Sequence, residues 1–210
     1  MSIVIRGYYS RYYLVAAQRG EKSVAEYERL LRTAVAYDPS MGRANTELAA
    51  LLLAQKQYEA ARERQQIAIR TYRPVRAFEQ LGAVHEKLAE ADGVTRKNEL
   101  EKARALYEKA ERVQPGNVRA LEHLMIMAYR ASDDVRLEQL ASQVVRSQAD
   151  NVNSIYLRAL AAERSGNQRA AYGLYQRIAA MRDLPKGTLA TSATVEQRLR
   201  QIRSTMNVGT

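Results

Sequence analysis

The side chains able to support catalysis are few in this sequence and stand apart. The chain has two histidines, His85 and His123, and no cysteine, so thiolate chemistry and disulfides are excluded. The acidic pair Asp133-Asp134 lies in a polar stretch typical of a solvated turn. None of the motifs G-x-x-x-x-G-K, G-x-S-x-G and H-E-x-x-H occurs. We therefore expect no enzyme, no metal site and no cofactor.

Arginine is the residue type that could support recognition instead. The chain has 33 basic and 23 acidic residues, and its net charge of +10 would attract acidic partners. Nucleic-acid binding calls for a basic stripe with aromatic stacking platforms. The basic residues here are spread along the chain, and the mixture of arginine and tyrosine at residues 6–13 is the only local candidate for such a site. We therefore expect a protein or peptide partner of acidic character and not a nucleic acid.

These arginines would be positioned by a repeated pair of short helices, most readily seen in residues 42–75. Its large and small residues recur at helical spacing around a polar turn at 55–58. They are Leu48, Ala49, Leu52, Ala61 and Ala68. This order of large and small residues over a period of ~34 residues resembles the tetratricopeptide repeat (TPR), whose pattern is W-x₂-L-G-x₂-Y…A-x₃-F…P. Small residues at the crossing points let two helices approach closely.

The resemblance covers nearly the whole chain and implies its fold. We expect five units at about 6–40, 41–74, 75–117, 118–151 and 152–185, and a capping helix with a tail at 186–210. Turns should lie near Gly20, Gln57, Gly93, Ser132 and Gly166, and the third unit has about nine additional residues around 91–98, which we expect to form a longer turn. The family implies an all-α, right-handed superhelical solenoid of antiparallel helix pairs. His85 stands where a core aromatic is usual, so we expect it to be packed.

The resemblance also implies a binding surface. In this family the first helix of each repeat lines a concave groove, and its second position faces inward. That position holds Arg43, Arg76 and Arg119, then Asn153. A second basic row holds Lys87, Arg130 and Arg164, and glutamates stand among both rows at 79, 86, 122 and 163. These rows either bind a carboxylate-bearing partner, as planar guanidinium groups do, or pair with the neighbouring glutamates. The Lys and Asn pattern of the family's carboxylate clamps is absent.

The two ends of the chain differ from the repeats. A short β-favouring run is followed by aromatic residues spread over a wide arc of the first helix, which has no preceding unit to cover it. Tyr9, Tyr12 and Ala16 are expected on its buried face. The last helix has Val195 and three further apolar residues at i, i+4, i+7 and i+11, and it either caps the fifth unit or receives a neighbouring molecule. The residues we expect to support self-association are Ile3, Val4, Ile5, Tyr8, Tyr9, Tyr12, Tyr13, Leu199, Ile202 and Met206.

The sequence thus predicts a non-catalytic interaction or scaffold module that binds a partner peptide or protein in its groove. Two alternatives stay open: a structural subunit that assembles head-to-tail into a filament or ring, and an accessory domain of a larger bacterial membrane or secretion assembly. The chain has no run of about eighteen apolar residues and no signal-peptide pattern. We expect a soluble protein, cytoplasmic unless a signal was removed before Met1.

Overall fold

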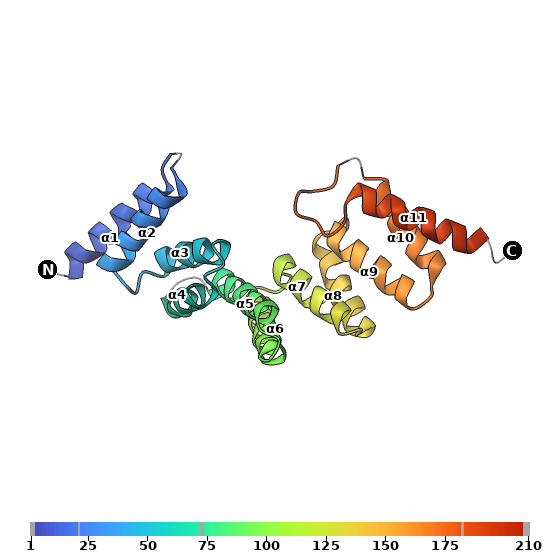
Figure 1. The fold of residues 1–210 in the computed structure, drawn as a ribbon, viewed down its shortest axis with the longest axis horizontal. Helices are drawn as coiled ribbons and strands as arrows, with labels where there is room; N and C mark the ends of the chain where they lie inside the picture. The colour runs from blue at the N-terminus through green and yellow to red at the C-terminus, as the bar shows by residue number, and fades with distance from the viewer. Residues whose placement is uncertain (1–2, 21, 72–73, 182, 208–210) are drawn as a thin grey trace. The chain divides into compact units, whose positions relative to one another are not determined.

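The computed structural model describes residues 3–20, 22–71, 74–181 and 183–207, and these residues form helices joined by short turns, with a longer non-helical segment before the last helix (Figure 1). The helices are α1 (Ile3–Gln18), α2 (Val24–Tyr37), α3 (Gly42–Ala54), α4 (Tyr58–Thr71), α5 (Pro74–Ala91), α6 (Arg96–Val113), α7 (Val118–Arg130), α8 (Asp134–Ser147), α9 (Val152–Arg164), α10 (Gln168–Ala179) and α11 (Ser192–Asn207). The described residues contain no strand, so the predicted all-α class is confirmed.

Consecutive helices pack as antiparallel pairs, as predicted: α1 on α2, α3 on α4, α5 on α6, α7 on α8 and α9 on α10. Within each stack the second helix of one pair also contacts the first helix of the next, as α2 does α3 and α8 does α9. The chain divides into two compact units, Met1–Gln114 (unit 1) and Pro115–Thr210 (unit 2). The boundaries of the five repeats themselves stay a prediction.

Local signals in the sequence explain where the helices begin and end. The side chain of the residue preceding several helices accepts a hydrogen bond from the backbone N–H three residues later, an N-cap that stabilises a helix by about 1 kcal/mol. The residues that do so are Ser23, Asn117, Asp133, Asn151 and Asn167. The turns fall at the five predicted places. In one of them Gly166 has φ +77°, a conformation that glycine adopts without strain.

Unit 1 packs through small residues at its helix crossings. Ala34, Ala61 and Ala103 are fully buried, as is the ring of Tyr107, which lies against Gly82. In the first pair, however, the expected register is wrong. Ser10, Leu14 and Ala17 form the buried face of α1, whereas Tyr12 is 58% exposed. Tyrosines at this spacing fit either face of a helix, and the hydrogen bond from Ser10 Oγ to the Ala34 carbonyl (2.8 Å) belongs to the face that is buried.

Two further expectations are corrected by the helix bounds. The β-favouring run at residues 3–5 is the first turn of α1, because an extended segment there would have no partner strand. The additional residues of the third unit do not form a long loop. They lengthen both helices to 18 residues, against 13 and 14 in α3 and α4, and leave a short turn at 92–95. Extending a packed helix pair buries more apolar surface than a longer loop would.

Unit 2 ends in a helix that covers its last pair. Thr191 Oγ1 accepts a hydrogen bond from the Thr194 N–H (3.1 Å) at the start of α11. Val195 and Ile202 are buried, and Leu199 packs against the same core as α9 and α10. The side chain of Met206 lies outside the described residues. In the parts of the chain described, no helix combines the length and the apolar character that a membrane span requires.

Candidate functional site

The Glu47 carboxylate on α3 is the centre of a polar cluster in unit 1. The Tyr27 hydroxyl on α2 donates a hydrogen bond to Glu47 Oε2 (2.8 Å), and the Gln18 amide on α1 donates to Glu47 Oε1. Arg43, one turn before Glu47, approaches the same oxygen with its Nε at 3.5 Å and donates from Nη2 to Gln18 Oε1 at 3.1 Å. Three helices therefore hold one carboxylate in place.

The charges of this cluster affect the pKa of Tyr27. Burial, followed by the hydrogen bond and the negative charge of Glu47, raises the pKa of Tyr27 to about 12. The positive charges of Arg76 and Arg43 oppose that increase. The hydroxyl is therefore a hydrogen-bond donor at neutral pH, and both arginines lie near enough to act on the same group.

The cluster borders a cavity of about 560 Å³. The lining residues come from α1, α2, α3, α5 and the turn after α1: Ala17, Gln18, Gly20, Lys22, Tyr27, Glu47, Ala50, Leu51 and Arg76. Its size lies within the range of about 300–1,000 Å³ that is typical of ligand sites. Lys22, Arg43 and Arg76 outnumber the one carboxylate, so the surroundings of the cavity carry net positive charge.

The predicted basic residues divide between the two units. Arg76 lines the cavity of unit 1, Arg43 pairs with Glu47, which also lines it, and Lys87, also in unit 1, pairs with Glu90 at 2.6 Å. In unit 2, Arg164 pairs with Asp134, donates to the Tyr129 carbonyl at 2.8 Å and lies over the Tyr129 ring.

Three of the predicted basic residues have no ion pair with any residue that the structure describes. They are Arg76, Arg119 and Arg130, and all three are exposed. Pairing with a neighbouring acidic residue, the alternative to binding a partner, therefore applies to only some of the six predicted basic residues. Arg76 differs from the other two because it lies at the cavity.

Comparison with known proteins identifies the architecture. No family model matches the chain, and no curated protein does. Among solved structures, a thermophilic TPR protein of Thermus thermophilus, TTC0263, matches with a TM-score of 0.63 and 18% identity, covering 97% of this chain and all of the other. A TPR protein of Parabacteroides merdae matches with a TM-score of 0.69 and 15% identity over 98% of this chain and 73% of the other. The chain has a tetratricopeptide-repeat fold.

A third TPR structure is similar to this chain. It is YrrB, a TPR protein with an unusual peptide-binding site, which matches with a TM-score of 0.61 and 12% identity over 84% of both chains. At these identities the similarity shows the TPR fold and does not transfer a binding site. The resemblance to the TPR family that the repeat pattern indicates is thereby confirmed at the level of fold.

The tyrosines at the start of the TPR fold separate into two groups. The rings of Tyr9 and Tyr13 stack on Tyr37 of α2, with centroid distances of 5.3 and 5.5 Å. Tyr8 and Tyr12 meet Tyr9 and Tyr13 edge-to-face, with centroid distances of 5.8 and 5.4 Å, and are 68% and 58% exposed. Ile5 is also partly exposed, while the side chains of Ile3 and Val4 lie outside the described residues.

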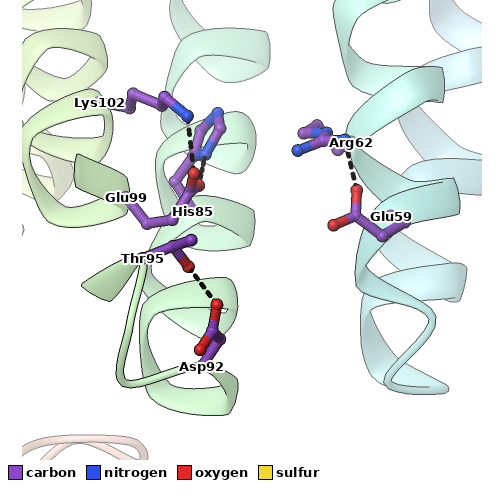
Figure 2. Close-up of polar contacts among 7 residues, drawn as sticks. All are labelled: Glu59, Arg62, His85, Asp92, Thr95, Glu99 and Lys102. Atoms are coloured by element: carbon purple, nitrogen blue, oxygen red, sulfur yellow. Dashed lines mark hydrogen bonds and ion pairs between the residues drawn. The ribbon is translucent and has the colours of Figure 1, made fainter. Parts of the chain in front are cut away.

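A second polar group of the TPR fold is buried between α5 and α6. Figure 2 shows the Glu99 carboxylate between the His85 Nδ1 atom at 2.5 Å and the Lys102 Nζ atom at 2.6 Å. Burial would raise the pKa of Glu99, but hydrogen bonds from Lys102 and His85 outweigh it and lower that pKa. His85 is thus packed and hydrogen-bonded, as expected from its position in the repeat. Among the described residues, no group of three or more His, Asp or Glu side chains is placed to hold a metal ion.

Unit 2 has a polar cavity of its own, of about 620 Å³. Glu122 Oε1 accepts hydrogen bonds from the Asn151 and Asn153 amides at 2.9 and 3.1 Å. The Asn153 side-chain oxygen accepts from the Leu189 N–H at 2.8 Å. The groove position in this repeat is therefore bonded to the segment between α10 and α11.

Three residues of the unit 1 site are not predicted by the sequence pattern: Gln18, Tyr27 and Glu47. Glu47 could have been found, because it follows Arg43 by four residues and lies on the same helix face. Tyr27 shares helical spacing with Leu31 and Ala34, which indicates packing and gives no sign of a polar role. Gln18 carries no local signal, since its role depends on the approach of α3.

Proposed function

We propose that this chain is a non-catalytic TPR module that binds an acidic peptide segment of a partner protein, and that Arg43 and Arg76 contact its carboxylates. The observation that carries the proposal is the anchored Glu47 carboxylate, which lines the same cavity as Arg76 and pairs with Arg43. Glu47 keeps Arg43 oriented, and Arg76 has no ion pair among the described residues.

Guanidinium chemistry supports an acidic ligand. A guanidinium group matches a carboxylate with two parallel N–H donors, and charge-assisted hydrogen bonds are roughly twice as strong as neutral ones. Because positive charge exceeds negative charge around the cavity, a second carboxylate is attracted even though Glu47 is present. Arg119 and Arg130, which are exposed near opposite ends of α7 in unit 2, are proposed as further contacts for carboxylates. Lys87 and Arg164 would first have to leave their local partners.

Fluorescence anisotropy with a labelled 12-residue peptide of alternating Asp, Glu and Ser tests this proposal. We expect binding by the full chain, loss of affinity of at least about tenfold in Arg43→Glu with Arg76→Glu, and weaker binding at high salt. The matched control is Arg29→Glu with Arg104→Glu, two exposed arginines of unit 1 on α2 and α6, which changes the net charge equally. Equal affinity in the two double variants would contradict the proposal, as would equal binding of the Asn, Gln and Ser version of the peptide.

Head-to-tail self-assembly is the alternative, and the two terminal helices argue against it. Leu199 and Ile202 pack inside unit 2 and would have to leave that core to meet a second copy. The terminal helices also carry like charge: α1 has two arginines and no acidic residue, and α11 has three arginines and one glutamate. Light scattering of the full chain at high concentration tests this alternative, which requires a mass that increases with concentration.

A further inference from the structure

We propose that the exposed aromatic stripe of α1, formed by Tyr8, Tyr12 and Val15, is the apolar half of the same binding surface. The ligand is then a peptide segment of a partner protein in which an acidic side chain is accompanied by apolar side chains. The acidic half of this ligand rests on the proposed function, and the apolar half is the new inference.

The stripe is a continuous feature of α1. Its three residues stand at i, i+4 and i+7 and so share one face of the helix. All are partly exposed, Val15 at 41%. A row of large apolar side chains on one exposed helix face marks an interaction surface more often than isolated exposed residues do.

The stripe is not needed to hold α1 in the fold. α1 packs through Ser10, Leu14 and Ala17, and a second contact stacks Tyr9 and Tyr13 on Tyr37. Within the described part of the chain, the ring contacts of Tyr8 and Tyr12 are edge contacts with their neighbours in the sequence, Tyr9 and Tyr13. Polar substitution of the stripe should therefore leave the packing of α1 intact.

The stripe adjoins the cavity. Val15 lies one turn before Gln18, and both Ala17 and Gln18 line the cavity beside Glu47 and Arg76. A ligand that places a carboxylate near Arg76 can therefore continue along α1. Tyrosine suits this role, because its large rigid ring buries much area while few rotamers are lost.

Charge selects the kind of segment that can lie there. Arg11 and Arg19 stand at helical spacing from the stripe, three residues after Tyr8 and four after Val15, whereas Arg6 lies on another face of α1; residues 1–20 contain no acidic side chain. None of these three arginines forms an ion pair with a residue that the structure describes. A peptide with acidic residues beside its apolar anchors complements this surface, whereas a basic segment would be repelled.

Selection from a displayed library of random 12-residue peptides tests the inference, with the full chain as bait. We expect the selected peptides to combine Asp or Glu with Leu, Ile, Phe, Tyr or Trp. Tyr8→Ser, Tyr12→Ser and Val15→Ser together should reduce affinity for a selected peptide by about tenfold or more. They should not change affinity for the same peptide with its apolar residues replaced by Ser. The control variant combines Val24→Ser, Val94→Ser and Val113→Ser, three exposed apolar residues elsewhere in unit 1.

The outcomes separate the two proposals. Acidic peptides without apolar residues, bound equally by the stripe variant, would overturn the inference and leave the proposed function standing. Peptides without acidic residues would overturn the proposed function. A stripe variant that binds every peptide normally but no longer cosediments with phosphatidylglycerol vesicles would show a membrane contact and overturn the inference. An unchanged circular dichroism spectrum and urea midpoint would show that the variant is folded.

Discussion

Replacing Gly82 by alanine should destabilise unit 1, although alanine is the better helix former. A Cβ atom at Gly82 would lie 2.7 Å from Cζ and 2.8 Å from Cε1 of the Tyr107 ring, well inside ordinary contact. The ring cannot move aside easily, because Tyr107 is fully buried and its hydroxyl donates to Glu86 Oε2 at 2.9 Å. The clash lies where α5 crosses α6.

Two opposing effects set the magnitude. Overpacking of a buried contact costs about 1–3 kcal/mol. Alanine in place of glycine within a helix stabilises by about 0.5–1 kcal/mol. We therefore expect Gly82→Ala to lower the free energy of unfolding by about 1 kcal/mol, the difference between the midpoints of the two effects. Burial also raises the pKa of Tyr107, so its hydroxyl stays protonated and bonded to Glu86 at any ordinary pH.

Urea unfolding followed by circular dichroism measures this change, and Gly173→Ala in α10 is the matched control. A Cβ atom at Gly173 meets no atom within 4 Å, so alanine there should stabilise unit 2 by about 0.5–1 kcal/mol. The reasoning thus predicts opposite signs for the same substitution in two helices. Stabilisation by Gly82→Ala similar to that by Gly173→Ala would refute the helix register and the packing of Tyr107 described above.

Two further predictions concern buried contacts in the two units. Glu99→Gln should lower the free energy of unfolding by about 1–3 kcal/mol, because His85 and Lys102 lose their shared carboxylate. Since the folded-state pKa of Glu99 is lowered, its contribution is present above the unfolded-state pKa and is lost as pH falls through the folded-state pKa. The stabilities of wild type and variant in urea should therefore converge in acid. Deleting residues 192–210 should lower the melting temperature of unit 2, because burial of Val195 and Ile202 contributes about 3 kcal/mol or more. An unchanged thermal unfolding curve would show that α11 does not stabilise the fold.

Much of the local structure could be predicted from the sequence, because it depends on residues close together in the chain. Gly166 and Ser132 mark tight turns, and Asn151 caps the helix that follows it. Alanines at helical spacing, such as Ala61 and Ala68, predicted close crossings, and both are fully buried. The all-α fold follows from this repetition, since no single helix pair can bury its apolar face alone.

Where the sequence allowed two packings, only the tertiary structure decided between them. The sequence pattern of α1 allows either Tyr12 or Leu14 to face the core. The contact of α1 with α2 buries the face that contains Ser10 and Leu14. The additional residues near Gly93 became helix, because α5 and α6 pack along their extended length.

The candidate site depended on tertiary structure most of all. The sequence by itself determined that arginines recur at one position of the repeat, which is a property of spacing. It did not determine that Arg76 lines one cavity together with Glu47, the partner of Arg43, while Lys87 pairs with Glu90 instead. The side chains around Glu47 come from α1, α2 and α3, and they meet only when the helix pairs stack. Charge interactions fall off with distance and with exposure to water, so the folded positions decide which charges pair and which stay free to bind a partner.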